Sequence, residues 1–211
     1  MPKLELYNLY RELMMPFDLF MWSGKGGLSD IIKNVTKSPF SHASVGVWMQ
    51  PIIGCPIRHF NAESTTLNNV PDAFYGDFRK GVQIVNFSQR LDGYDGEVWW
   101  VPLKEPFTEQ QKLDMTVWLL QKEADRTQYD LDQGIKAVQR DSDTPLWARI
   151  LATPFASLTP NTEDFGKLFC SEMVCKLYKI AGRIPQDVNA STVTPNELLE
   201  FNIYKDPVKI I

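Results

Sequence analysis

Cysteine and histidine are scarce in this chain of 211 residues, which contains three cysteines and two histidines. An odd number of cysteines without a closely spaced framework does not form a set of disulfides, so we expect reduced thiols. The sequence also lacks the C-x-x-C and H-x-x-x-H spacings typical of zinc sites. We therefore expect no metal and no other cofactor, and the few thiols and imidazoles become the main candidates for chemistry.

Excess positive charge and long apolar runs are also missing. Lysine and arginine total 22 against 26 aspartates and glutamates, and this net charge of −4 disfavours general binding to nucleic acid. No segment approaches the roughly 20 apolar residues of a membrane-spanning helix, and the first residues do not resemble a secretory signal. We expect a cytoplasmic protein, which includes a viral or phage protein in a host cytoplasm.

The composition is that of a folded globular protein, with 44% hydrophobic and 23% charged residues. A chain of this length buries roughly 70% of its unfolded surface without needing a disulfide or a metal. Residues 23–27 are rich in glycine, but their spacing is not that of a phosphate-binding loop. We interpret this stretch as a flexible turn.

Several segments have the period-two pattern of strands. The clearest spans residues 42–48, where Ala43, Val45 and Val47 alternate with polar or small residues. Further strands are predicted over residues 14–22, 57–64, 82–87 and 97–103.

Helices are predicted from capping residues and apolar spacing. Ser29 is expected to cap a short helix that ends before Pro39. Thr108 and Gln111 form a capping box at the start of a longer helix. The apolar stripe of that helix is assigned to Leu113, Val117, Leu120 and Ala124.

Residues 125–167 are less regular and include an apolar stretch over residues 146–155. Helical pieces are expected at residues 130–139 and 145–157, joined by an acidic linker. We interpret the segment as a helical insert or lid, and a surface that makes transient contact with lipid is the alternative.

The last predicted helix, residues 169–181, has an informative cysteine, Cys170, in its first turn. One helix face with i, i+3, i+4 and i+7 spacing is made by Cys170, Met173, Val174, Leu177 and Ala181. At the first turn, free N–H groups and the helix dipole stabilise a thiolate and can bind an oxyanion. Cys175 lies about 140° around the helix, and Cys55 sits in a proline-flanked turn, so both are expected to be bystanders.

His42 begins its strand on the same face as Ser44 and Gly46, small residues expected to let a helix pack beside the imidazole. Glu63 lies near the end of the strand over residues 57–64. If the two strands pair in antiparallel fashion, Glu63 returns beside His42 and can hold the ring N–H.

Two interpretations of these residues remain open at this point. A buried cysteine at a helix start and a histidine at a strand start are often structural. Alternatively, Cys170 supplies a nucleophile, His42 carries its proton, and Glu63 orients the imidazole.

The order of the motifs resembles a known family. The histidine comes first, after a Ser-Pro-Phe-Ser turn, and the cysteine comes last, which is the reverse of papain-like enzymes. Residues 26–42 look like the start of the circularly permuted NlpC-type cysteine hydrolases, in their YiiX-like branch. Further agreement is found, in the same order, at residues 62–64, 129–130, 169–174 and 193–198.

The resemblance implies a single α+β domain over residues 1–211 with a permuted papain-like fold. In that fold a small antiparallel sheet or partial barrel packs on the cysteine-bearing helix, with the helical insert at about 125–167. The resemblance also implies a thiol hydrolase or acyltransferase with Cys170 as nucleophile, His42 as base and Glu63 as orienting carboxylate. Glu172 is expected to be structural, because it leaves the face of the nucleophile.

The expected substrate is an amide or ester, from either a peptide or a lipid acyl group. The missing export signal and the apolar insert disfavour a cell-wall substrate. One alternative is a non-catalytic module that binds a lipid or peptide on the same fold. Another is a viral or phage structural component that uses residues 99–100 and 147–155 as contact surfaces, although such tryptophans are commonly core residues.

Overall fold

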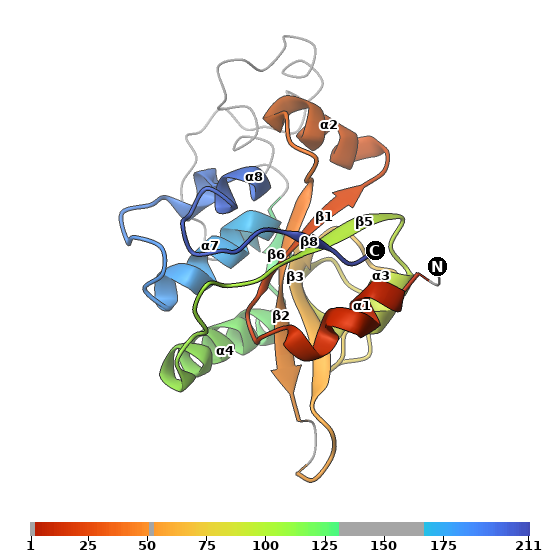
Figure 1. Ribbon diagram of the computed structural model, residues 1–211, viewed down its shortest axis with the longest axis vertical. Helices are drawn as coiled ribbons and strands as arrows, with labels where there is room; N and C mark the ends of the chain where they lie inside the picture. Colours follow the sequence, from red (N-terminus) through yellow and green to blue (C-terminus); the bar gives the residue numbers. More distant parts are fainter. Residues whose placement is uncertain (1–2, 51–52, 131–166) are drawn as a thin grey trace.

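The molecule is built on a six-stranded antiparallel sheet in the order β4-β3-β2-β1-β5-β8 (Figure 1). The structure, a computed structural model, describes residues 3–50, 53–130 and 167–211. The strands are β1 (Leu19–Gly24), β2 (His42–Met49), β3 (Arg58–Thr65), β4 (Gly81–Asn86), β5 (Gly96–Val101) and β8 (Val208–Lys209). A separate parallel pair consists of β6 (Gln128–Tyr129) and β7 (Lys167–Leu168).

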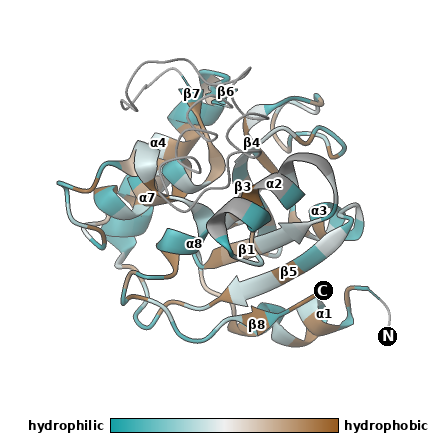
Figure 2. Cartoon of the chain, turned by 90° about the horizontal axis from the view of Figure 1, so that it is seen from above, coloured by the Kyte–Doolittle hydropathy of each residue, from teal (hydrophilic) through white to brown (hydrophobic). Residues whose placement is uncertain are grey.

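Helices cover both faces of this sheet. They are α1 (Glu5–Tyr10), α2 (Gly27–Thr36), α3 (Phe87–Asp92), α4 (Glu109–Ala124), α7 (Cys170–Ile180) and α8 (Pro195–Leu198). Short 3₁₀ turns are η1 (Arg11–Leu13) and η3 (Ala190–Thr192). Figures 1 and 2 show α4 and α7 on one side of the sheet and α1 and α3 on the other. The expected α+β class with a small antiparallel sheet is confirmed, and the sheet stays open within the described ranges.

Strand alternation produces two hydrophobic cores. In β1, Leu19 and Met21 point into the core beneath α4 and α7, while Phe20 and Trp22 point into the core beneath α1 and α3. Because neighbouring side chains of a strand face opposite ways, one apolar run can serve both cores. This burial on both faces explains why the apolar run of β1 is almost continuous.

The first strand is shorter than expected and begins later. Residues 14–18 form a turn in which Phe17 has a positive φ of 66°, and β1 starts at Leu19. The buried Asp18 carboxylate holds this turn, because it accepts hydrogen bonds from Met15 N, Trp100 Nε1 and Leu103 N. The prediction of a strand over residues 14–22 is therefore wrong at its start, where a non-glycine residue in the left-handed region interrupts the extended chain.

The helix cap at Ser29 is also wrong. Gly26, with φ of 74°, is the residue before the first turn of α2, and Ser29 lies inside the helix. This conformation is readily adopted by glycine because it has no Cβ. The glycine-rich stretch is thus shared by two elements, because β1 ends at Gly24 and α2 begins at Gly27.

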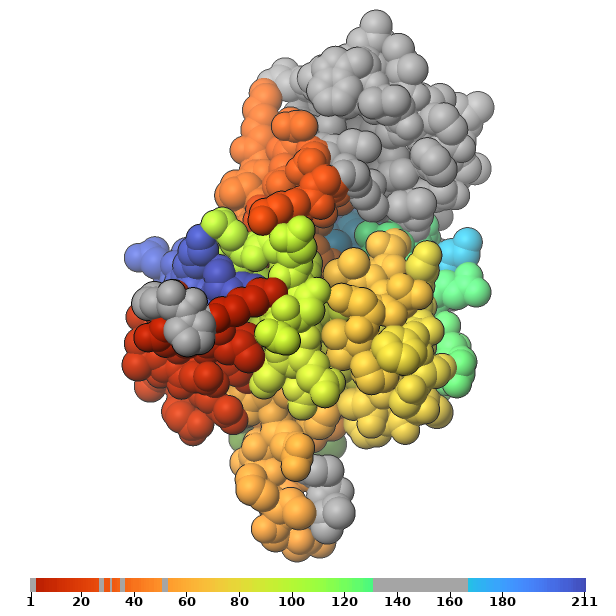
Figure 3. All heavy atoms as spheres, turned by 90° about the vertical axis from the view of Figure 1, so that its right-hand side faces the viewer, coloured from red at the N-terminus to blue at the C-terminus, as the bar shows by residue number. Residues whose placement is uncertain are grey.

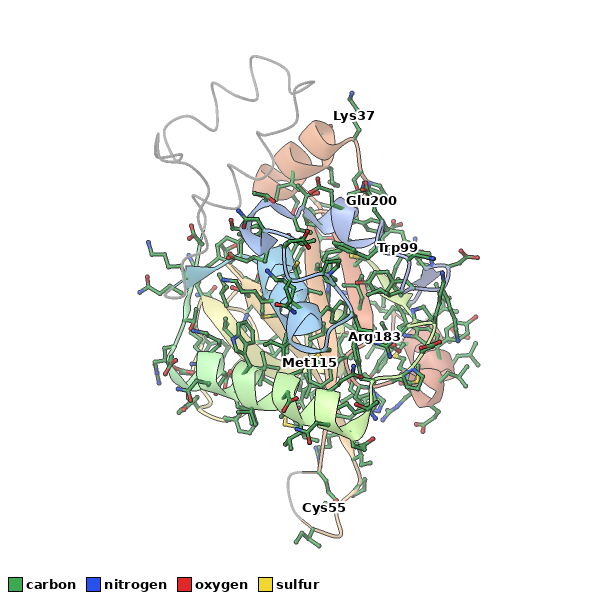
Figure 4. All side chains as sticks on the ribbon, turned by 90° about the vertical axis from the view of Figure 1, so that its left-hand side faces the viewer. Lys37, Cys55, Trp99, Met115, Arg183 and Glu200 are labelled. Atoms are coloured by element: carbon green, nitrogen blue, oxygen red, sulfur yellow. The ribbon has the colours of Figure 1, made fainter. Side chains whose placement is uncertain are left out.

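Helix α4 begins with the predicted capping box but buries a different face from the one predicted. Thr108 N donates to Gln111 Oε1, and Gln111 N donates to Thr108 Oγ1. Met115 and Leu119 are fully buried (Figure 4 labels Met115), whereas Leu113 and Val117 are 56% and 60% exposed. The predicted stripe is wrong at Leu113 and Val117, while Leu120 packs against the core. Helix α4 has two apolar rows, and the buried one continues to Glu123, which pairs with Arg79.

The aromatic pair at residues 99–100 belongs to the body of the protein. Trp100 is buried, and Trp99 packs edge-on against Phe40 with ring centroids 5.0 Å apart. This pair therefore fits the core interpretation and not the contact-surface one. The helical pieces predicted at residues 130–139 and 145–157 lie outside the described residues, as does the apolar stretch at 146–155. None of the helices over the described ranges is long and apolar enough to cross a membrane.

Candidate functional site

Cys170 is the first residue of α7 and is only 3% exposed. The helix packs against the sheet through Met173, Val174 and Leu177, which share a core with β2. This packing fixes the N-terminal end of α7 beside the start of β2, where His42 lies. The expected inward direction of Cys170 is therefore what the structure shows.

His42 and Glu63 are in direct contact, with His42 Nε2 2.8 Å from Glu63 Oε2. The antiparallel register, with Val45 opposite Ala62, returns Glu63 to the start of β2 as the sequence argument predicts. The Cys170 side chain hydrogen-bonds the same imidazole. Because Nε2 is engaged by Glu63, Nδ1 is the ring nitrogen left for the thiol. The structure thus brings all three predicted site residues together, with His42 in contact with both Cys170 and Glu63.

The surroundings of Cys170 favour its thiolate. Burial raises the pKa of the Cys170 thiol, but four other influences outweigh it. They are the hydrogen bond from His42, the charge of His42, and the backbone N–H groups of Ala43 and Ser171. The net pKa lies below the ordinary value, as expected for a thiol at a helix N-terminus beside an imidazole.

The imidazole is shifted in the complementary direction. Burial alone would lower the pKa of His42, but hydrogen bonding and charge from Cys170, followed by those of Glu63, raise it to about 9. At neutral pH the imidazole is therefore protonated, and the lowered pKa of Cys170 favours an ion pair between its thiolate and this imidazolium. Such an ion pair is a nucleophile and a proton donor already in place.

Tyr129 is a site residue whose role the sequence did not reveal. It forms part of the motif at residues 129–130, and pairing of β6 with β7 places it beside Phe169 and Cys170. Its side chain hydrogen-bonds Cys170, and burial followed by the charge of Cys170 raises the pKa of Tyr129 well above its ordinary value. Tyr129 therefore remains a neutral hydroxyl that can donate a hydrogen bond.

Arg90 is a second residue that sequence reasoning missed. It comes from the short helix α3, where Phe87, Arg90 and Leu91 are all buried. Arg90 Nε lies 2.6 Å from Glu63 Oε1, so the carboxylate contacts His42 through one oxygen and Arg90 through the other. An arginine on the apolar face of a short helix was the available signal, because a buried charge needs a partner.

The small residues of β2 have a different role from the expected one. Trp22 Nε1 donates to Ser44 Oγ, and a Cβ on Gly46 would meet the rings of Trp48 and Phe20. Ser44 and Gly46 thus face the core beneath α1 and α3, while α7 packs on the side of Ala43, Val45 and Val47. The expectation that Ser44 and Gly46 admit the cysteine helix is wrong, because α7 packs on the other side of the strand.

The other residues considered in the sequence, Cys175, Cys55 and Glu172, do not contact His42 or Glu63 in the interactions described above. Cys175 is fully buried in the core, and Cys55 lies at the end of the β2–β3 hairpin, far from α7 in Figure 4. Figure 3 shows this hairpin projecting from the body, and Ile53 at its tip is 98% exposed.

Glu172 is buried 2.9 Å from Lys176, and burial raises its pKa to about 7. This pairing within α7 fits the structural role expected for Glu172.

A cavity of about 320 Å³ opens beside His42. Its lining combines hydroxyl, amide and charged side chains with a few apolar ones. The lining residues that matter below are Ser41, His42, Thr65, Asn69, Tyr94 and Tyr129. A substrate group bound there would lie next to the imidazole and the tyrosine hydroxyl.

Comparisons with known proteins give information on the fold. No family model and no curated protein matches the chain. Among solved structures, it is similar to the crystal structure of metalloprotein yiiX from Escherichia coli O157:H7, with a TM-score of 0.57 and 12% sequence identity. The match covers 92% of this chain and 96% of that one. At this identity the likeness shows a YiiX-like fold alone, which confirms the coarser part of the family resemblance.

Proposed function

We propose that the chain is a cysteine-dependent hydrolase or acyltransferase that acts on an amide or ester bond through a thioester. The observation that supports it best is the buried line from Cys170 through His42 to Glu63. The lowered pKa of Cys170 and the raised pKa of His42 both favour the ionised forms that nucleophilic catalysis uses. The finer assignment to the permuted NlpC-type hydrolases belongs to the same proposal.

The geometry supports a two-step acyl transfer. The Cys170 thiolate attacks the carbonyl carbon, a C–S bond forms, and the carbonyl electron pair moves to oxygen. When the tetrahedral intermediate collapses, the bond to the amine or alcohol breaks and His42 gives its proton to that leaving group. Water or another acceptor then attacks the thioester carbonyl while His42 takes up the acceptor's proton. Collapse of this second intermediate breaks the C–S bond, which releases the acyl product and regenerates the thiolate.

Two hydrogen-bond donors are suited to stabilise the oxyanion. The backbone N–H of Cys170 lies in the first turn of α7, where N–H groups have no partner within the helix. The Tyr129 hydroxyl lies beside the sulfur and stays protonated. Preorganised donors of this kind commonly contribute most to acyl-transfer catalysis.

The proposed substrate is a peptide amide or a lipid acyl group, since the cavity beside His42 offers both polar and apolar contacts. A non-catalytic module would use the same cavity for binding alone. The two proposals differ in one observable, which is whether Cys170 becomes acylated and then turns over.

We expect a p-nitrophenyl acetate assay to separate them. The wild-type protein should release a stoichiometric burst of p-nitrophenolate and acquire an acetyl group on Cys170, located by mass spectrometry. C170S should give no burst, and H42A should slow it by roughly a hundredfold. C55S is the matched control and should behave like the wild type. Acetylation of Cys55 with Cys170 left unmodified would refute the mechanism and favour the binding module.

The word metalloprotein in the description of yiiX raises a metal-dependent alternative. A catalytic zinc site needs three protein ligands and an open position. Over the described ranges, no three histidine, cysteine, aspartate or glutamate side chains are grouped so as to hold a metal ion. At Cys170 and His42 the second ring nitrogen is already engaged by Glu63. This donor set does not fit a resident metal, so no step of the proposal passes through one.

A further inference from the structure

We propose that Arg90 is a positioning residue that fixes the Glu63 carboxylate against His42 and keeps the buried row of charges neutral overall. This inference rests on the proposed function, since it concerns the same nucleophile and base. Arg90 pairs with Glu63 and Asn69, so it would act through Glu63 rather than on the reacting atoms.

The contact geometry divides the carboxylate between two cations. Arg90 is 1% exposed and Glu63 is fully buried. Arg90 Nε lies 2.6 Å from Oε1 of Glu63, while Oε2 lies 2.8 Å from His42 Nε2. With one oxygen held by Arg90, the carboxylate cannot rotate away from the imidazole without breaking a buried ion pair.

The charges along the row alternate from Arg90 through Glu63 and His42 to Cys170. Burial would raise the pKa of Glu63, but the charge of Arg90 and then the contacts with His42 lower it below its ordinary value. Tyr94 also faces this carboxylate, and burial followed by the charge of Glu63 raises its pKa. Without Arg90 the row would hold one uncompensated negative charge, and protonating Glu63 or Cys170 would relieve it.

Asn69 anchors the far side of the guanidinium. Arg90 donates to Asn69 Oδ1, and Asn69 Nδ2 donates to the carbonyl oxygen of Gly93 at 3.1 Å. Asn69 and Gly93 both line the cavity beside His42. The guanidinium of Arg90 therefore contacts Asn69 on one side and the Glu63 carboxylate on the other. Such fixed contacts around an orienting carboxylate are expected next to a reactive group.

The experiment is the pH dependence of Cys170 alkylation by iodoacetamide, followed by mass spectrometry. In R90M we expect the midpoint of the alkylation profile to rise by about one pH unit relative to the wild type. R90K, which keeps the charge but loses the planar fork, should give an intermediate midpoint. N69A, at an exposed position, should shift it in the same direction by less.

A matched control is R79M, because Arg79 is a partly buried arginine that pairs with three carboxylates, those of Asp72, Asp77 and Glu123. Its midpoint should equal that of the wild type. A double-mutant comparison gives a further readout. If Arg90 acts through Glu63, adding R90M to E63Q should change the rate by less than about twofold.

The possible failures are distinguishable. If the wild-type Cys170 itself titrates as an ordinary thiol, the proposed function fails and the inference fails with it. If the wild type shows the lowered midpoint while R90M, R90K and N69A all match R79M, only the role of Arg90 is overturned. An R90M that does not fold leaves R90K, N69A and the E63Q background to decide the question.

Discussion

At the scale of single residues, the contact of Cys170, His42 and Glu63 could be predicted from the sequence, but the contacts of Arg90 and Tyr129 could not. Cys170 and His42 follow from helix spacing and strand position, and Glu63 follows from an antiparallel register. Arg90 is 27 positions from Glu63 and comes from a helix of six residues. No local pattern specifies which carboxylate a buried arginine will meet, because that choice depends on how α3 packs on the sheet.

The raised pKa of His42 predicts the alkaline limit of activity. Since the imidazolium supplies the leaving-group proton, kcat/KM for an ester or amide should fall as the pH rises through about 9. At the acid end, activity should fall as the Cys170 thiolate is protonated, at a pH below the ordinary cysteine value. A pH–rate profile checks both limits, and H42A should lose the alkaline one. A wild-type profile that keeps rising beyond pH 9 would contradict this assignment.

At the scale of elements, the sequence predicts where the helices α4 and α7 begin but not which face of α4 is buried. The capping box of α4 and the helix that begins at Cys170 are as predicted. The buried face of α4 is not, because two apolar rows compete and the Arg79 contact with Glu123 lies on only one of them. Helix α3 was missed because six residues are too few to display a helical period.

A ladder of buried side-chain hydrogen bonds, from Trp22 through Ser44 to Asn61, links strands β1, β2 and β3. We expect it to be important for stability. Trp22 Nε1 donates to Ser44 Oγ at 2.7 Å, and Ser44 Oγ donates to Asn61 Oδ1 at 2.6 Å. S44A should lower the free energy of unfolding by about 2 kcal/mol, because it leaves a buried donor and a buried acceptor without partners. Urea denaturation measures the loss.

The control for this prediction is T116A, which removes a hydroxyl that bonds within the surface helix α4. Its effect should stay within about 0.5 kcal/mol. If S44A were as stable as T116A, the ladder would not contribute to holding β3, and with it Glu63, against β2.

At the scale of the whole molecule, the fold assembles a site from distant parts of the chain. His42 and Cys170 come from opposite ends of the sequence and meet because α7 packs across β2. The likeness to yiiX extends over 92% of the chain at 12% identity, so architecture is shared far more widely than side chains are. Function must therefore be argued from the site.

We expect the proposed activity of this protein not to depend on a metal. Prolonged dialysis against EDTA should leave the p-nitrophenolate burst and the melting temperature of this protein unchanged, because its described donors do not group into a metal site. Added zinc should inhibit, since it would bind the Cys170 thiolate. Loss of the burst after EDTA, restored by a divalent metal, would replace the thiol mechanism with a metal-dependent one.

The alternating row from Arg90 to Cys170 has a consequence for the reaction as a whole. With Cys170 as a thiolate, the resting state of the proposed reaction holds two positive and two negative groups, which cancel. In the proposed thioester state the sulfur would be uncharged and His42 would have given up its proton, so Arg90 and Glu63 would cancel by themselves. The buried row would thus stay electrically neutral on both sides of the proposed acylation step. A proton could then leave with the leaving group while the surrounding dipoles have little to rearrange.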